Sequence, residues 1–247
     1  MAQTTIQQNS IAPLRNVQLF HVMMQQLDDR SDGAPGMGVF YGPAGFGKSQ
    51  ASIWSATRRR ACLVQCESTW TPTALCHAIL EELGVKATPP VWRMSKQIQT
   101  ALASENIPLI IDEADYVVTR KYIELIRDIY EKSLVPVVLI GEENLPQKLR
   151  KWDRFNSRIL VREGAQPMGG EDFATLAGVR CPDLEMSTDL EAKIIEVSKG
   201  SARWVVVNLD FVHRTAKKLG KSTLSLSDID ERKLQSGEAG PPRRFAG

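Results

Sequence analysis

The sequence predicts an α/β protein with a parallel five-stranded sheet flanked by helices, followed by a small all-helical subdomain. Short apolar runs alternate with amphipathic segments from residue 37 to about residue 163, and no further strand pattern appears after about residue 170. Strands that alternate with helices need crossover connections, which produce a parallel sheet with helices on both faces. A chain of 247 residues with 43% hydrophobic content can bury such a core and an appended subdomain.

Each expected strand is a short apolar run, and each expected helix has apolar residues three or four positions apart. Thr71 and Pro72 suit the N-cap and first residue of one helix, and Gly84 suits its end. The strands are expected at residues 37–41, 61–66, 108–111, 135–140 and 159–161. The helices are expected at residues 17–27, 50–57, 72–84, 91–102 and 122–129.

The C-terminal part is expected to be helical throughout. Thr188 and Glu191 have capping-box spacing ahead of a helix at 189–197, and a longer helix is expected at 202–219. Ser227 and Asp230 suggest one more helix start. The predicted boundaries are a flexible arm at 1–12, an α/β nucleotide-binding subdomain at 13–165, a helical lid subdomain at 166–235 and a disordered tail at 236–247.

A phosphate-binding loop is predicted directly after the first strand. Residues 42–49 fill the pattern G-x-x-x-x-G-K-[ST] between a strand and a helix, the context that this pattern needs. The glycines let backbone N–H groups converge on an anion, and the helix start adds its positive dipole end. Lys48 is expected to reach the β- and γ-phosphates of ATP, and the Ser49 hydroxyl to hold Mg²⁺. The predicted nucleotide contacts here are Gly42, Pro43, Ala44, Gly45, Phe46, Gly47, Lys48, Ser49 and Gln50.

Two acidic residues, Asp112 and Glu113, follow the apolar residues of the third strand. In an open parallel sheet, ligands bind at the carboxyl ends of the strands. Asp112 is expected to ligate magnesium through water, and Glu113 to orient and polarise the attacking water. Residues 112–115 also spell the box of a large helicase superfamily, but such helicases need two tandem α/β domains and this chain has room for one.

Two further polar groups could complete the site. Glu142, just after the fourth strand, could sense the γ-phosphate or hold the attacking water, although a solvated acidic turn is an equally good interpretation. Arg154 and Arg158 end a predicted basic helix over 148–158. Either is a candidate arginine finger for a neighbouring subunit, which would stabilise the charge on the transferring phosphoryl group.

Composition excludes some other kinds of site. The four cysteines form no C-x-x-C pair and stand at no zinc-ligand spacing from the histidines, which predicts reduced, buried thiols. No signal sequence opens the chain and no apolar run reaches membrane-spanning length, so a cytoplasmic protein without membrane contact is expected. The net charge of +2 indicates nothing about nucleic acid, which must be judged from local clusters.

With both nucleotide motifs in place, the chain resembles the AAA+ ATPases over roughly residues 13–220. Within them it is most similar to the transposition ATPases, the group of phage Mu transposition protein B and the transposon target-selection ATPases. The residues that carry the resemblance are Arg15-Asn16, Gly42 to Ser49, Leu109 to Asp115, Leu139 to Gly141, Ser157-Arg158 and Gly200 to Arg203.

The resemblance implies roles for residues outside the two motifs. Arg203 would reach from the lid to the γ-phosphate, and Arg158 would act across a subunit interface. Arg15 and Asn16 would lie at the nucleotide, while Glu142 stands where the family usually has a small neutral polar sensor. It further implies a homo-oligomer, as a ring or a filament, with ATP and Mg²⁺ as its ligands.

Two functions follow from this resemblance. One is an ATP-dependent oligomer on double-stranded DNA that selects target DNA for a transposase. The alternative is an adaptor of the helicase-loader or initiator type that contacts mainly protein. Basic residues discriminate between them, because related ATPases place DNA contacts beside the helix before the third strand and at the start of the helix after it. The candidates are Lys86, Arg93, Lys96, Arg120 and Lys121, each of which could equally be an ordinary solvated side chain.

Overall fold

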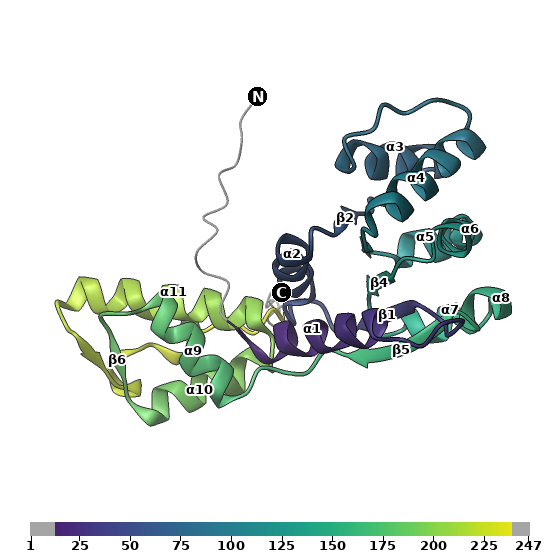
Figure 1. Cartoon of the computed structure of the whole chain (residues 1–247). Helices are drawn as coiled ribbons and strands as arrows, with labels where there is room; N and C mark the ends of the chain where they lie inside the picture. The colour runs from purple at the N-terminus through teal and green to yellow at the C-terminus, as the bar shows by residue number, and fades with distance from the viewer. Residues whose placement is uncertain (1–12, 239–247) are drawn as a thin grey trace, which may run out of the picture. The chain divides into compact units, whose positions relative to one another are not determined.

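The computed structural model describes residues 13–238 of the chain (Figure 1). Backbone contacts divide these residues into two compact units, one from Arg15 to Gln166 and the other from Pro167 to residue 238, which also takes in Pro13 and Leu14. The predicted arm at 1–12 and the predicted tail beyond residue 238 lie outside the described residues. Within the described part, no helix combines the length and the apolar character that crossing a membrane requires.

The first unit is built on a five-stranded parallel sheet, which confirms the predicted fold class. The strand order is β2-β3-β4-β1-β5, so β1 lies between β4 and β5 rather than beside β2. This order brings the carboxyl ends of β1, β3 and β4 to one edge of the sheet. The strands are β1 (Met37–Tyr41), β2 (Cys62–Gln65), β3 (Leu109–Asp112), β4 (Val137–Gly141) and β5 (Ile159–Gly164).

Alternate residues of the strands face different helices, because successive side chains of a strand point to opposite faces of the sheet. Val39, Ile111 and Leu139 belong to the cluster formed with α3, α4 and α6. The intervening Phe40 instead stacks edge-on against Phe20 of α1, with ring centroids 5.2 Å apart. In Figure 1, α1 runs along β1 and β5 and packs against α2, so helices cover both faces.

The helices of this unit agree with the predicted positions, with two corrections. Thr71 caps α3 by accepting the Ala74 N–H at 3.3 Å, with Pro72 as the first helical residue. A short helix, α5, was missed, and the predicted basic helix over 148–158 is broken into α7 and α8 around Arg150 to Trp152. The helices are α1 (Arg15–Asp28), α2 (Lys48–Arg59), α3 (Pro72–Glu82), α4 (Val91–Glu105), α5 (Asp115–Thr119), α6 (Ile123–Ser133), α7 (Leu145–Leu149) and α8 (Asp153–Asn156).

The second unit has its own apolar core and is mainly helical. Its helices are α9 (Gly170–Arg180), α10 (Thr188–Ser198) and α11 (Ala202–Leu219), with 3-10 turns η1 (Leu226–Asp228) and η2 (Glu231–Lys233). The prediction of an all-helical subdomain was wrong in one detail, because β6 (Glu185–Met186) and β7 (Thr223–Leu224) form a two-stranded parallel sheet.

The caps of the second unit also differ from the prediction. Ser187, not Thr188, is the N-cap of α10. In place of one more helix start at Ser227, the chain makes two 3-10 turns, and the capping box belongs to Ser225 and Asp228. One-residue shifts of this kind are expected where several polar residues compete for a cap.

All four cysteines are buried, as predicted, and none forms a disulfide. Burial raises the pKa of the Cys62 and Cys66 thiols to about 12. Because the thiolate is the reactive form, these side chains act as small apolar groups of the core and not as nucleophiles. Among the described residues, no group of three or more His, Cys, Asp or Glu side chains is arranged to hold a metal ion.

Candidate nucleotide-binding site

The phosphate-binding loop connects β1 to the first residue of α2 and is held at the edge of the sheet. Gly45 and Gly47 have φ angles of 83° and 82°, which side chains with a Cβ rarely adopt. The Gly42 N–H donates to the Gly141 carbonyl at 3.3 Å, which ties the loop to the end of β4. The loop therefore curves so that its backbone N–H groups and the N-terminus of α2 form one anion-binding concavity.

Lys48 folds back across this loop. Its Nζ donates to the carbonyl oxygens of Gly42 at 2.6 Å and Pro43 at 2.8 Å. Burial lowers the pKa of Lys48, and the nearby carboxylates of Asp112 and Glu113 oppose that shift. The loop carbonyls thus hold the ammonium group at the concavity, where it can meet the terminal phosphates of a nucleotide.

Ser49 and Asp112 join the two sequence motifs directly. The Ser49 hydroxyl donates to Asp112 Oδ2 at 2.6 Å, although the residues are 63 positions apart. Asp112 is 4% exposed, and its Oδ1 accepts the Glu113 N–H at 2.8 Å. A hydroxyl and a carboxylate are the hard oxygen ligands that Mg²⁺ prefers, so these two side chains fit a magnesium ion bound with a nucleotide.

Glu113 lies just beyond β3 with a left-handed backbone, φ 55°. Its pKa is raised because burial removes water from the carboxylate and because Asp112 lies nearby, while Lys48 acts in the opposite direction. A carboxylate with a raised pKa accepts a proton more readily than an ordinary glutamate does. Glu113 therefore has the position and the basicity that activating a water molecule requires.

Asp115 connects the ends of β3 and β4, a role that sequence reasoning missed. It is 7% exposed, and its carboxylate accepts the Glu142 N–H at 2.7 Å and the Lys148 ammonium at 2.6 Å. A Cβ on Gly141 would lie 2.2 Å from Asp115 Oδ2, so a larger residue there would displace the Asp115 carboxylate. The one signal in the sequence is the acid three positions after Asp112, which the helicase pattern obscured.

Asn16 holds the loop in place rather than pointing its amide at a ligand. Its Nδ2 donates to the carbonyls of Phe46 and Gln166, both at 2.8 Å, and its Oδ1 accepts the Gln166 N–H at 2.8 Å. The amide thereby connects the start of α1, the phosphate-binding loop and the chain after β5. Arg15 and Gln50 are exposed beside these elements.

The comparison with protein families identifies the chain. A family model described as "AAA domain" matches residues 14–149, more than half of the sequence. The chain belongs to the AAA+ ATPases. The family binds nucleotides and hydrolyses ATP, which agrees with the meeting of Lys48, Ser49, Asp112 and Glu113 at one edge of the sheet.

Solved AAA+ structures share this fold at low sequence identity. Cdc6p from Pyrobaculum aerophilum has a TM-score of 0.65 at 12% identity, with 96% of this chain and 71% of that chain covered. Orc1 from Aeropyrum pernix, solved in complex with DNA, has a TM-score of 0.62 at 15% identity, and this chain spans 63% of its length while 87% of this chain is covered. Domain III of the replication initiation protein DnaA from Thermotoga maritima has a TM-score of 0.55 at 16% identity, with 89% of each chain covered. No curated protein matches this sequence significantly.

The remaining AAA+ site predictions fall at different places in the structure. Glu142 is exposed, yet its carboxylate is close enough to contribute to both pKa shifts. It opposes the lowering of the Lys48 pKa by burial and adds to the raising of the Glu113 pKa. Arg203 is an exposed residue in the first turn of α11, in the second unit, where Ser201 is the N-cap. The role of Arg203 at the phosphates remains a prediction.

The two candidate arginine fingers differ in their surroundings. Arg158 pairs through Nε with Glu131 and donates from Nη1 to the Ser157 hydroxyl at 3.0 Å, while its side chain stays 41% exposed. Arg154, in α8, is exposed and its guanidinium pairs with no described residue. Glu131 therefore holds Arg158 in one orientation, whereas Arg154 is not oriented by its neighbours.

The predicted DNA contacts are all exposed and lie in three places of the first unit. Arg93 and Lys96 of α4, together with Trp92, are here called the α4 surface, and Lys86 lies apart from them in the loop before α4. Trp92 is 58% exposed, and its ring faces the side chains of Arg93 and Lys96. The ring centroid lies 5.4 Å from Arg93 Cζ and 5.7 Å from Lys96 Nζ. This tryptophan was not among the residues predicted to contact DNA.

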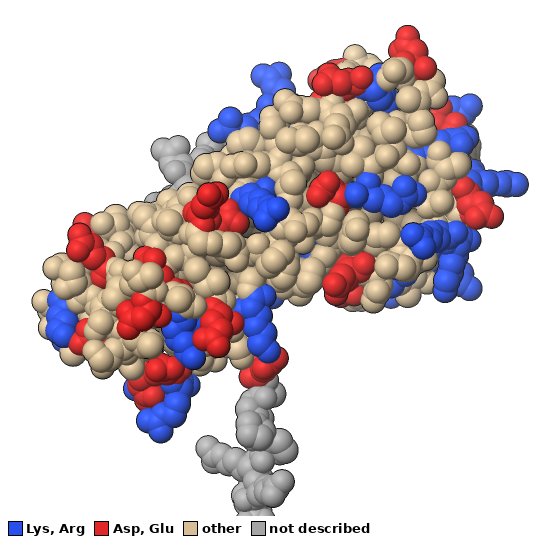
Figure 2. Space-filling model, turned by 90° about the horizontal axis from the view of Figure 1, so that it is seen from below, with Lys and Arg blue, Asp and Glu red and all other residues tan. Residues whose placement is uncertain are grey.

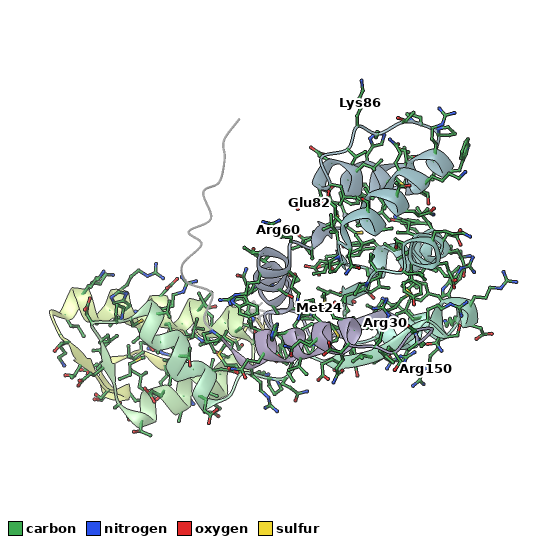
Figure 3. The ribbon with its side chains drawn as sticks, viewed as in Figure 1. Met24, Arg30, Arg60, Glu82, Lys86 and Arg150 are labelled. Atoms are coloured by element: carbon green, nitrogen blue, oxygen red, sulfur yellow. The ribbon has the colours of Figure 1, made fainter. Side chains whose placement is uncertain are left out.

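Gln97 fixes the loop that carries Lys86. Its amide donates to the Lys86 carbonyl and accepts the Thr88 N–H, both at 2.9 Å. Figure 3 shows the Lys86 side chain pointing outward beyond α3 and α4. The third place is the turn between α5 and α6, where Arg120 and Lys121 are both exposed.

Proposed function

We propose that this AAA+ ATPase assembles as a homo-oligomer on double-stranded DNA when it binds ATP, without sequence specificity, and presents that DNA to a transposase. The observation that carries the DNA part is the α4 surface. It places two exposed cations, Arg93 and Lys96, over one exposed tryptophan, Trp92, and no described acidic residue pairs with them. Unpaired cations of this kind favour a polyanionic partner.

Four residues divide the work of ATP hydrolysis. Lys48 binds the terminal phosphates, and Ser49 with Asp112 hold magnesium, which when bound neutralises charge on the phosphates. Glu113 orients a water molecule toward the γ-phosphorus and takes up its proton. Asn16 and Asp115 position these groups by fixing the phosphate-binding loop and the end of β4.

The DNA contacts are expected to reach phosphates rather than bases. Lysine and arginine side chains on separate exposed turns offer charge and no pattern that matches base edges. Figure 2 shows acidic and basic side chains interspersed on the face seen from below, so no single basic face dominates that view. Strong binding therefore needs many copies of these side chains aligned along the duplex, which is what ATP-dependent assembly would supply.

Neutralising the turn between α5 and α6 should weaken duplex binding equally for all sequences. Lys121 has φ 62°, so Lys121→Asn, which tolerates a left-handed backbone, combined with Arg120→Gln removes two charges without straining the turn. We expect the slope of log affinity against log salt to flatten by about two. Fluorescence anisotropy with two unrelated duplexes measures this, and Lys132→Ala, an exposed lysine of α6, serves as the control. Unchanged affinity and slope in the double variant would refute the assigned contacts.

Arg158→Ala should leave ATP binding intact and reduce hydrolysis by about a thousandfold, because the charge is supplied to a neighbour's site. Mixing Arg158→Ala with Glu113→Gln subunits should restore part of the activity, since some interfaces then pair an intact Glu113 with an intact Arg158. Arg150→Ala is the matched control, because Arg150 is an exposed arginine between α7 and α8 (Figure 3). If co-assembled mixtures stay inactive, Arg154 replaces Arg158 as the candidate finger.

A second candidate function is an initiator- or loader-type ATPase that contacts mainly protein. The likeness to domain III of a replication initiation protein over 89% of each chain favours it, whereas the transposase role is supported by the motif resemblance. Electron microscopy with an ATP analogue, with and without duplex DNA, separates the two. Assemblies that form only on DNA support the first function, and nucleotide-dependent assembly indifferent to DNA supports the second.

A further inference from the structure

An open groove lies between two parts of the chain, the end of α5 with the turn that follows it, and α7 with the turn that joins it to α8. Its volume is about 350 Å³. Its lining residues are Val118, Thr119, Lys121, Lys148, Lys151 and Trp152. No acidic residue belongs to this lining, which consists of three lysines, one tryptophan, one valine and one threonine.

The charges of the groove are only partly compensated. Lys148 pairs with Asp115, while neither Lys121 nor Lys151 forms an ion pair with any described residue. Like charges brought together repel, and an anion placed among them relieves that repulsion. The left-handed backbone of Lys121, φ 62°, holds it beside the groove at some cost in backbone energy.

The shape and the chemistry select the class of ligand. A volume of about 350 Å³ is within the range of small-molecule sites. Lysines suit a phosphate group, and the aromatic side chain of Trp152 suits a nucleobase, because bases stack on aromatic side chains regardless of their identity. A nucleotide unit, a phosphate next to a planar base, matches both halves of the lining.

The groove also contacts the ATPase machinery through Lys148. Its Nζ lies 2.6 Å from Asp115 Oδ1, while Asp115 Oδ2 accepts the Glu142 N–H at 2.7 Å. Asp115 is three residues beyond Asp112, and its carboxylate contributes to the electrostatic environment of Glu113 and Lys48. An anion in the groove would compete with Asp115 for Lys148. Binding in the groove would therefore change the contacts of Asp115 at the ends of β3 and β4.

We propose that this groove binds one nucleotide unit, either of a single-stranded nucleic acid or of a free nucleoside monophosphate, and that its occupancy changes ATP turnover through Lys148 and Asp115. The proposal adds a site to the nucleic-acid part of the proposed function, but it requires neither the assembly nor the α4 surface. A failure of either proposal can therefore be recognised separately.

Binding is tested without ATP, by fluorescence anisotropy of a labelled oligothymidylate. Lys151→Ala and Trp152→Leu should each weaken binding by about tenfold, whereas Lys132→Ala should stay within about twofold of the wild type. Lys151 is exposed, so its variant should fold normally, and thermal unfolding checks Trp152→Leu, whose ring packs on the core. Competition with thymidine monophosphate shows which source is bound, because a free nucleotide site would release the oligonucleotide at low monophosphate concentration. If Lys151→Ala and Lys132→Ala bind the oligothymidylate with equal affinity, the groove is not the binding site.

The coupling is tested with Asp115→Asn, which keeps an oxygen for the Glu142 N–H and removes the charge that holds Lys148. Oligonucleotide binding should be retained or strengthened, because Lys148 is released into the groove. The ratio of ATP turnover with and without oligonucleotide should differ from one in the wild type and return to one in this variant. A ratio of one in the wild type, or the same ratio in the wild type and in Asp115→Asn, would overturn the coupling. If the groove tests fail while Lys151→Ala still binds duplex DNA as the wild type does, only the groove proposal has failed.

Discussion

Lys48→Ala should abolish nucleotide binding, with affinity falling by at least about a hundredfold. Lys48 is the only cationic side chain in the phosphate-binding loop, and its Nζ is held there by the carbonyls of Gly42 and Pro43. A charge-assisted hydrogen bond to phosphate contributes about 1.5–3 kcal/mol, and the truncation also removes the ammonium charge that faces the terminal phosphates. Isothermal titration calorimetry with a non-hydrolysable ATP analogue measures the loss.

The control for this variant must separate lost binding from lost folding. Lys48 lies in the first turn of α2, where alanine is a good helix former, so thermal unfolding without nucleotide should stay close to that of the wild type. Lys132→Ala removes an equal charge from an exposed site on α6 and should bind the analogue normally. Wild-type affinity in folded Lys48→Ala protein would show that the loop is not the phosphate site.

Glu113→Gln should bind ATP as tightly as the wild type but turn it over about a hundred to ten thousand times more slowly. Glutamine has nearly the same shape as glutamate, yet its amide cannot take up the proton of the attacking water. The raised pKa of Glu113 strengthens this expectation, because the basicity that burial and Asp112 produce is lost entirely. Steady-state phosphate release and analogue titration separate kcat from binding.

Glu105→Gln is the matched control for this prediction. Glu105 is an exposed glutamate at the end of α4 and pairs with no described residue, so its turnover should be that of the wild type. If Glu113→Gln hydrolyses ATP as fast as Glu105→Gln, another group activates the water. Glu142 would then be the next candidate, because its carboxylate is near enough to influence both Glu113 and Lys48.

The elements that could be predicted from the sequence are those with a local pattern of apolar residues. The five strands were found because each is a short apolar run, and the helix predicted at 202–219 agrees with α11 over its full length. The five-residue α5 and α7 are too short to show a period, and the two-residue β6 and β7 form only where the chain brings them together. These elements depend on packing rather than on pattern.

By itself, the sequence determined the phosphate-binding loop and the two acids at the end of β3, because each depends on a few adjacent residues in or beside a strand. Only the tertiary structure decided what the neighbouring side chains do. The order β2-β3-β4-β1-β5 places Asp115 against Glu142 and Lys148, Asn16 against Phe46 and Gln166, and Arg158 against Glu131. Contacts between residues 27 to 150 positions apart depend on how strands and helices pack together in space. The local pattern of a sequence does not indicate which distant elements will be neighbours.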